Sequence, residues 1–183
     1  MTNSAIAKYK PSANFDNNEL SWYAIYVRFK SEKFVTNLLQ KKGIEAYIPL
    51  KTAVKRYSRK IKTYHLPLIN CYVFVKINGN DRVKVIETEN VLKFVKTGDN
   101  LGKIPEKEIE ILRKITGEFN DQLEIEPSSW VQGNKVEIVR GGLAGTKGYI
   151  TERKNKKVFL IALENMGFDL ILEVEATDLE LSK

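Results

Sequence analysis

The residues best suited to bind another molecule lie between positions 51 and 64. This segment, KTAVKRYSRKIKTY, carries six basic side chains, two tyrosines and no acidic side chain. Basic side chains neutralise nucleic-acid phosphates, and the ring of Tyr57 or Tyr64 can stack on a base. The predicted phosphate contacts are Lys51, Lys55, Arg56, Arg59, Lys60 and Lys62. The alternative is a solvated surface without a partner, because basic runs are common.

Few side chains in this sequence are suited to catalysis. The chain has one histidine, His65, and one cysteine, Cys71. A histidine-based triad, a cysteine-based metal site and an intrachain disulfide are therefore not expected. The sequence also lacks the GxGxxG and GxxxxGKS phosphate loops. Cys71 is expected to pack in the core of an apolar strand. We expect a binding protein rather than an enzyme, with no metal ion or cofactor.

The charge of the chain is unevenly distributed. Residues 1–120 hold 22 Lys and Arg against 12 Asp and Glu, whereas residues 121–183 hold 8 against 11. This asymmetry indicates two parts with different partners, the first attracted to polyanions or to acidic protein surfaces. The sequence has no apolar run of about 18 residues, and its polar start does not resemble a signal peptide. We expect a cytoplasmic protein.

Residues 21–117 have the pattern of an α/β domain. Aromatic and β-branched runs predict four strands, at residues 22–28, 44–48, 68–77 and 91–95. Capping residues and apolar spacing predict three helices, at residues 31–43, 81–88 and 105–117. The basic segment between the second and third strands is predicted to be a protruding hairpin or a long loop. This order predicts helices packed against one mostly antiparallel sheet.

The pattern changes towards the C-terminus. Residues 118–132 are polar and acidic and are predicted to be a linker. Residues 133–183 contain four or five short alternating strands, which predict a small β-barrel. The glycine-rich segment 141–148 suits tight turns within that barrel. Residues 1–20 are predicted to be a disordered tail.

The combination of these elements resembles the NusG family of transcription elongation factors. The resemblance rests on Trp22-Tyr23, on Tyr72-Val-Phe-Val75, on Val91–Val95 and on the KOW-like segment Val136–Ile150. It covers about residues 21–181. It implies an α+β fold, with an NGN-like α/β sandwich linked to a small KOW-type, SH3-like β-barrel.

Within the family, the chain is similar to the RfaH and UpxY types. These are antiterminators that act on long operons, such as those for surface polysaccharides. The similarity rests on the basic hairpin, on the extended N-terminal tail and on Asn70-Cys71-Tyr72, which replaces the family's Pro-Gly-Tyr or Pro-Asn-Tyr. The missing proline leaves the geometry of that loop open.

The resemblance implies that an apolar, aromatic groove binds the clamp helices of the largest RNA polymerase subunit. The matching residues are Tyr23, Ile69, Tyr72 and Phe74, with Phe94 at the edge and Arg82 facing the opposite polymerase jaw. About half of this set is expected to be core, because alternate residues of a strand point to opposite faces. Bridging the polymerase cleft would stabilise its closed state and suppress pausing.

The resemblance implies two further partners for a monomeric protein. The basic hairpin would lie near upstream or non-template DNA. The barrel would recruit ribosomal protein S10 or the Rho terminator through residues 165–168, with Met166 and Phe168 as anchors. Two alternatives stay open: a housekeeping factor linking polymerase to Rho or the ribosome, and a ribosome- or RNA-binding KOW protein without a polymerase role.

Overall fold

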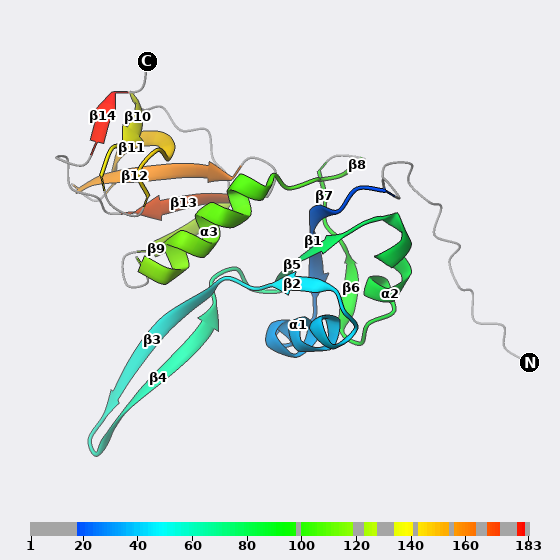
Figure 1. The fold of residues 1–183 in the computed structure, drawn as a ribbon. Coiled ribbons are helices and arrows are strands. Elements are labelled where there is room, and N and C mark those ends of the chain that lie inside the picture. The colour runs from blue at the N-terminus through cyan, green and yellow to red at the C-terminus, as the bar shows by residue number, and fades with distance from the viewer. Residues whose placement is uncertain are drawn as a thin grey trace, which may run out of the picture.

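The elements of the first 118 residues follow the predicted order. The computed structural model describes residues 18–97, 100–118, 123–127, 134–140, 143–153, 156–163, 168–172 and 179–181. The helices are α1 (Glu32–Lys41), the 3₁₀ turn η1 (Gly79–Asp81), α2 (Arg82–Ile86) and α3 (Glu106–Glu118). The strands are β1 (Ser21–Val27), β2 (Glu45–Tyr47), β3 (Leu50–Tyr57), β4 (Lys60–Pro67), β5 (Tyr72–Ile77), β6 (Val91–Phe94), β7 (Lys96–Thr97) and β8 (Asn100–Leu101). Figure 1 shows their arrangement.

Four of these strands form one antiparallel sheet in the order β2-β5-β1-β6. One face carries Tyr23, Ile25 and Val75, which pack in a single buried cluster with α1 and α2 residues such as Val35 and Val85. The other face carries alternate residues, because successive side chains of a strand point in opposite directions. The sheet therefore has one face covered by α1 and α2, and its second face must be covered by other elements.

The predicted central strand is shorter than its apolar run. The expectation of a strand over 68–77 is wrong for its first four residues, because β4 ends at Pro67 and β5 begins at Tyr72. Leu68 and Ile69 are buried in the connecting turn, so their apolar character reflects burial and not strand geometry. Cys71 has a φ of 65°, a left-handed conformation that an extended strand excludes. The prediction that Cys71 packs within a strand is therefore also wrong.

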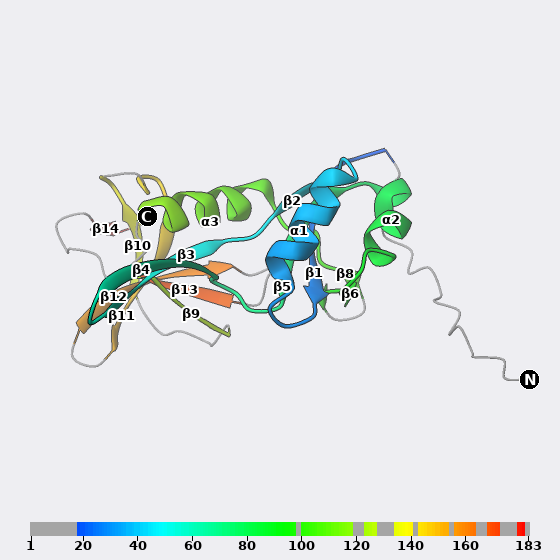
Figure 2. The same ribbon diagram turned by 90° about the horizontal axis from the view of Figure 1, so that it is seen from below.

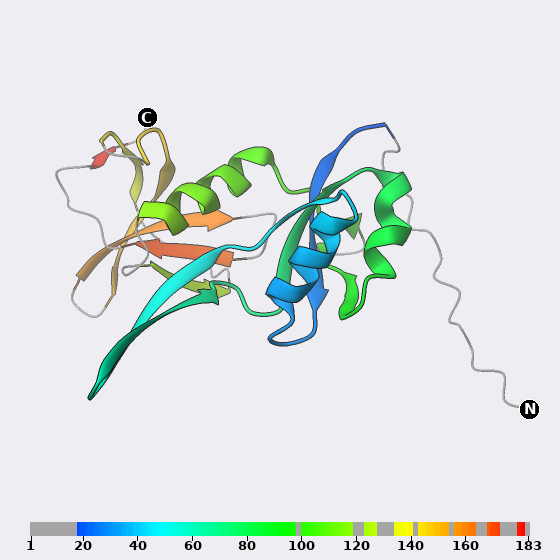
Figure 3. The same ribbon diagram turned by 60° about the horizontal axis from the view of Figure 1, so that its bottom comes forward.

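The basic segment forms the predicted hairpin. Strands β3 and β4 pair only with each other, from Leu50 opposite Pro67 to Tyr57 opposite Lys60. The two-stranded ribbon extends away from the four-stranded sheet (Figures 1 and 3). Its outer half is exposed to solvent on both strands.

Helix α3 is attached to the second face of the sheet. The Trp22 Nε1–H donates a hydrogen bond to Glu106 Oε2 at 2.9 Å, and Lys76 Nζ pairs with the same oxygen at 2.8 Å. Further along α3, the Arg113 guanidinium stacks over the rings of Trp22 and Tyr47, with its carbon 5.4 and 5.2 Å from their centroids. These contacts attach both halves of α3 to residues of the sheet.

The C-terminal part forms a six-stranded antiparallel sheet in the order β14-β10-β11-β12-β13-β9. Its strands are β9 (Leu123–Pro127), β10 (Asn134–Ile138), β11 (Lys147–Arg153), β12 (Lys156–Leu163), β13 (Phe168–Leu172) and β14 (Leu179–Leu181). Strand β9 lies within the range predicted to be a linker, where it pairs with β13. The sheet corresponds to the expected KOW-type, SH3-like domain, so the expected fold class is confirmed.

One glycine of the KOW-like segment allows two strands to approach closely. A Cβ atom on Gly148 would meet the Leu160 carbonyl oxygen and lie 2.6 Å from Cζ of Phe159. Because Phe159 is fully buried, its ring has little room to move. Gly145 serves a different purpose, since its φ of 84° favours glycine in the turn before β11. Gly141 and Gly142 lie outside the described residues.

The two parts of the chain share one hydrophobic cluster. Helix α3 lies beside the six-stranded sheet (Figures 1 and 2). Its buried stripe of Ile109, Leu112 and Ile115 belongs to the same cluster as Phe74 of the first sheet and Phe159 of the second. The second face of the four-stranded sheet is therefore covered by α3 together with the C-terminal strands.

The Glu106 contacts predict a pH-dependent contribution to stability. The hydrogen bonds from Lys76 and Trp22 lower the pKa of the Glu106 carboxyl below its ordinary value. A lowered carboxyl pKa stabilises the fold above the unfolded-state pKa, and this stabilisation is lost as the pH falls through the folded-state pKa. Glu106→Gln should therefore lower the urea midpoint of unfolding at pH 7 and have a smaller effect at a pH below the carboxyl pKa. An effect of equal size at both pH values would contradict this assignment.

Candidate functional site

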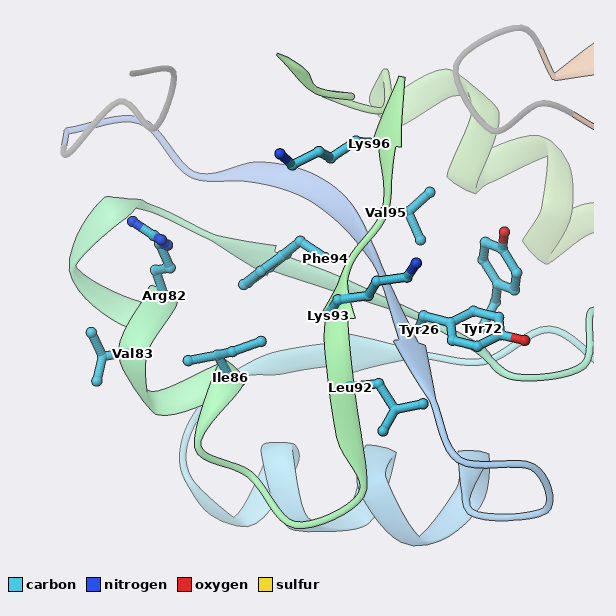
Figure 4. Close-up of a pocket in the computed structure, with 10 residues that line it drawn as sticks. All are labelled: Tyr26, Tyr72, Arg82, Val83, Ile86, Leu92, Lys93, Phe94, Val95 and Lys96. Atoms are coloured by element: carbon cyan, nitrogen blue, oxygen red, sulfur yellow. The ribbon is translucent and has the colours of Figure 1, made fainter. Parts of the chain in front are cut away.

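A groove runs along the free edge of the four-stranded sheet. Its volume is about 900 Å³, and strand β6 forms its centre (Figure 4). Helix α2 forms one side, and the Tyr26 and Tyr72 rings lie on the other side of β6. The lining residues are Tyr26, Tyr72, Arg82, Val83, Ile86, Leu92, Lys93, Phe94, Val95 and Lys96.

Apolar side chains in this groove are exposed to solvent. Leu92 on strand β6 is 49% exposed, and Val83 on helix α2 is 57% exposed. In Figure 4, the Ile86 side chain points towards Phe94 across the space between α2 and β6. Contiguous exposed apolar residues at a concave surface are typical of protein-binding sites.

Two tyrosines form the wall of the groove at the second face of the sheet. Tyr26 and Tyr72 are directly opposite in the pairing of β1 with β5, and their rings meet edge to face at 5.5 Å. Burial raises the pKa of Tyr72, and a hydrogen bond with Cys71 raises the pKa of Tyr26. Both phenols are therefore neutral at physiological pH and present an apolar ring with a polar hydroxyl, a combination that is enriched at protein interfaces.

Basic side chains flank the same groove. Lys93 Nζ lies 5.9 Å from the centroid of the Tyr26 ring, and Lys96, the first residue of β7, lies above Phe94 in Figure 4. Arg82 is on the α2 side. The exposed apolar side chains of Val83, Ile86 and Leu92 form what we call the apolar floor of the groove. The groove thus combines this apolar floor with positive charge at its margins, which suits a partner with apolar and acidic side chains.

A buried carboxylate holds the turn that precedes Tyr72. Glu32 is the first residue of α1, and its Oε1 accepts the Cys71 backbone N–H at 2.8 Å. The helix N-terminus favours a negative charge at this position. The bond fixes the left-handed turn at Cys71 and with it the start of β5. Sequence patterns did not identify Glu32, because its partner is a backbone group 39 residues away.

The structure separates the predicted polymerase-binding residues into two groups. Tyr23, Ile69 and Phe74 are almost completely buried, with Tyr23 only 2% exposed under α1 and α2. Tyr23 packs under α1 and α2, whereas Ile69 and Phe74 belong to the cluster that includes the C-terminal strands. Tyr72 and Arg82 line the groove, as does the buried Phe94. Sequence reasoning missed Tyr26, although its place on the same strand face as Trp22 and Ala24 was a usable indication.

The C-terminal sheet contacts the same wall of the groove. The Phe168 ring at the start of β13 meets the Tyr72 ring edge to face, with centroids 5.3 Å apart. Phe168 and Tyr72 were predicted to bind different partners, yet each is partly covered by the other here. Met166, the second predicted anchor, lies outside the described residues.

The predicted nucleic-acid contacts all lie on the hairpin. Lys51 is half-buried near its base, whereas Lys55, Arg56, Lys60 and Lys62 are exposed along its length and Arg59 is exposed in the turn.

In the part of the chain that the structure describes, no group of three or more His, Cys, Asp or Glu residues is arranged to hold a metal ion. Within that part, no helix has the length and apolar character needed to cross a membrane.

Comparison with a solved structure supports this architecture. The structure of Thermotoga maritima NusG, described as showing a domain interaction, is similar with a TM-score of 0.54 and 17% identity over 90% of this chain and 98% of that chain. A weaker likeness, with a TM-score of 0.31 and 18% identity over 88% of this chain and 97% of that one, is to the MjSpt4:Spt5 complex in conformation B. No curated protein sequence matches significantly.

The family assignment rests on the sequence itself. Residues 20–113 match the family model described as transcription termination factor NusG. This match covers about half of the chain and includes β1 to β6 and most of α3. The chain belongs to the NusG family of transcription factors.

Proposed function

We propose that this protein binds RNA polymerase through the groove along β6 and promotes elongation by suppressing pausing and termination. The supporting observation is the exposed apolar floor next to Tyr26 and Tyr72. Aromatic side chains beside a concave apolar surface are typical anchors for a partner helix. The clamp helices of the largest polymerase subunit are the partner that the family membership favours. The hairpin would at the same time contact upstream or non-template DNA.

Removing the Tyr72 side chain should weaken polymerase binding. Truncation of a tyrosine anchor costs about 2 kcal/mol or more, a factor of roughly thirty, but Tyr72→Ala also removes the competing Phe168 contact, so the affinity for purified core polymerase should fall at least about threefold. Leu92→Glu should have a similar effect, because it places a charge in the apolar floor. Phe34→Ala is the matched control, since Phe34 is exposed on α1 and does not line the groove. Biolayer interferometry with immobilised polymerase measures all three variants.

The result of that measurement also separates the candidate functions. Retention of polymerase by the unmodified chain, with loss in both groove variants, supports the proposal. No retention of polymerase would leave a ribosome- or RNA-binding KOW protein as the better description. Equal retention by Phe34→Ala and Tyr72→Ala would contradict the proposed position of the site.

The contact between Phe168 and Tyr72 should compete with polymerase. A polymerase helix cannot contact the face of Tyr72 that Phe168 covers, so full contact with this ring requires the C-terminal sheet to move. An edge-to-face ring pair contributes about 0.5–1.5 kcal/mol, so Phe168→Ala should increase polymerase affinity roughly two- to tenfold. Circular dichroism would establish that the variant is folded. Unchanged or weaker binding by a folded variant would show that the contact does not compete.

We propose further that the protein is a specialised antiterminator similar to the RfaH and UpxY types, acting on long operons. The basic hairpin supports this assignment, because it offers a nucleic-acid contact beyond the polymerase groove. The alternative is a housekeeping factor that links polymerase to Rho or to ribosomal protein S10 through the C-terminal sheet.

Transcript profiles distinguish these two roles. Deletion of the gene should shorten transcripts at a few long operons, because a specialised factor is needed only where it is recruited. Sequencing of RNA 3′ ends, in cells with and without the gene, measures this directly. A change of termination across most of the genome would indicate the housekeeping role instead. Restoring the gene in the deletion strain is the control.

A further inference from the structure

The pairing register of the hairpin sorts its side chains onto two different faces. Directly opposite residues of an antiparallel pair share a face, and alternate residues take the other. The pairs on one face are Lys51 with Leu66, Ala53 with Tyr64, Lys55 with Lys62, and Tyr57 with Lys60. The pairs on the other face are Thr52 with His65, Val54 with Thr63, and Arg56 with Ile61. The basic residues that the sequence places in one run are therefore not equivalent.

We call the face that carries Lys55 and Lys62 the lysine–tyrosine face, because it contains four lysines and two tyrosines. These six residues are Lys51, Lys55, Tyr57, Lys60, Lys62 and Tyr64, and the face also carries Ala53 and the exposed Leu66. The Tyr57 and Tyr64 hydroxyls lie 3.4 Å apart, and Lys55 Nζ lies 5.9 Å from the centroid of the Tyr64 ring. These contacts confirm that the side chains of Lys55, Tyr57 and Tyr64 lie on the same face of the hairpin. Cationic groups thus surround two solvent-accessible aromatic rings.

The opposite face has a different chemical character. Val54 is 55% exposed and Ile61 is 66% exposed, and Arg56 is the basic residue between them. Thr52 and His65 interact with each other on this face, with Oγ1 and Nδ1 3.4 Å apart. The β-branched side chains offer neither a flat ring for stacking nor a charge for phosphate. Arg56 and His65 are the groups of this face that could contact nucleic acid, against four lysines and two tyrosines on the other face. This face is therefore the less suited of the two to nucleic acid.

We propose that the hairpin binds a single-stranded polynucleotide on its lysine–tyrosine face alone, with little preference for sequence. The inference rests on the proposed contact between the hairpin and nucleic acid and specifies its ligand. Lysine ammonium groups neutralise phosphates without reading bases, and tyrosine rings stack on any unpaired base. A hydrogen bond with Tyr57 raises the pKa of Tyr64, so this ring stays neutral beside phosphates.

Duplex DNA is the less suitable ligand for this face. A two-stranded ribbon can enter the major groove, where arginine or lysine reads guanine and asparagine or glutamine reads adenine. Of these residue types the lysine–tyrosine face offers only lysine, and Arg56 points from the opposite face. Bases in a duplex are stacked on each other, so Tyr57 and Tyr64 cannot stack on them without unpairing. Phosphate contacts alone would remain, and the rings would contribute nothing.

Neighbouring residues of one strand provide a matched test. Lys55→Gln and Arg56→Gln each remove one positive charge, at adjacent positions on opposite faces. Binding of the full chain to a labelled 12-nucleotide single strand is measured by fluorescence anisotropy at several salt concentrations. Lys55→Gln should lower the salt slope by about 0.7, as expected for one lost contact to a single strand, and Arg56→Gln should leave the slope unchanged.

The tyrosines test the stacking component in the same assay. Tyr64→Ala should weaken single-strand binding at least about fivefold, because stacking contributes on the order of 1 kcal/mol or more per base. Ile61→Ala, an exposed truncation on the opposite face, should change it less than twofold. The unmodified chain should prefer single-stranded DNA to a duplex of the same sequence and bind the matching RNA within about threefold. Circular dichroism of each variant establishes that it is folded.

The possible failures have distinct meanings. Preference for the duplex, or equal salt slopes for Lys55→Gln and Arg56→Gln, would overturn the single-face inference while the nucleic-acid contact stands. No binding of any oligonucleotide at low salt would overturn the contact itself and this inference with it. Polymerase binding by the same preparation would show that the groove is independent of either result.

Discussion

The antiparallel pairing of β1 with β5 determines which side chains form each face of the sheet, and therefore which elements must pack on each face. With Tyr23 opposite Val75 and Tyr26 opposite Tyr72, alternate side chains form one face for α1 and α2 and a second face rich in aromatic rings. The first face is a conventional core. The second is larger than α3 covers alone, since it shares its buried cluster with the C-terminal strands. Both the proposed polymerase groove and its partial cover follow from this one register.

In the proposed function, the aromatic face takes part in two interactions that compete for Tyr72. Tyr72 contributes to the groove wall and also contacts Phe168. Burial of an apolar surface stabilises the intramolecular contact in the same way as it would stabilise a complex, at roughly 25 cal/mol per Å². Covering Tyr72 within the chain limits its exposure when no partner is bound. We infer that polymerase binding and release of the C-terminal sheet are thermodynamically linked, because polymerase and Phe168 would compete for the Tyr72 ring.

Local patterns predicted much of the fold, but they did not determine which side chains would be accessible. Apolar spacing correctly located β1, α1, β6 and the buried stripe of α3. The run from Leu68 to Ile77 was misleading, because buried turn residues are as apolar as strand residues. Tyr23 and Tyr26 are three positions apart on one strand, and only the pairing partners decide which is buried. Strand alternation by itself separates Lys55 from Arg56, but only the hairpin register shows that Lys60, Lys62 and Tyr64 share the face of Lys55.

Hydrogen–deuterium exchange of the full chain, with and without core RNA polymerase, tests the central claim most directly. The outward-facing amides of an edge strand exchange readily unless a partner covers them. The account predicts slower exchange in peptides spanning α2 and β6 when polymerase is bound, together with faster exchange at the start of β13, where Phe168 leaves Tyr72. Protection confined to the C-terminal sheet, with α2 and β6 unchanged, would contradict it.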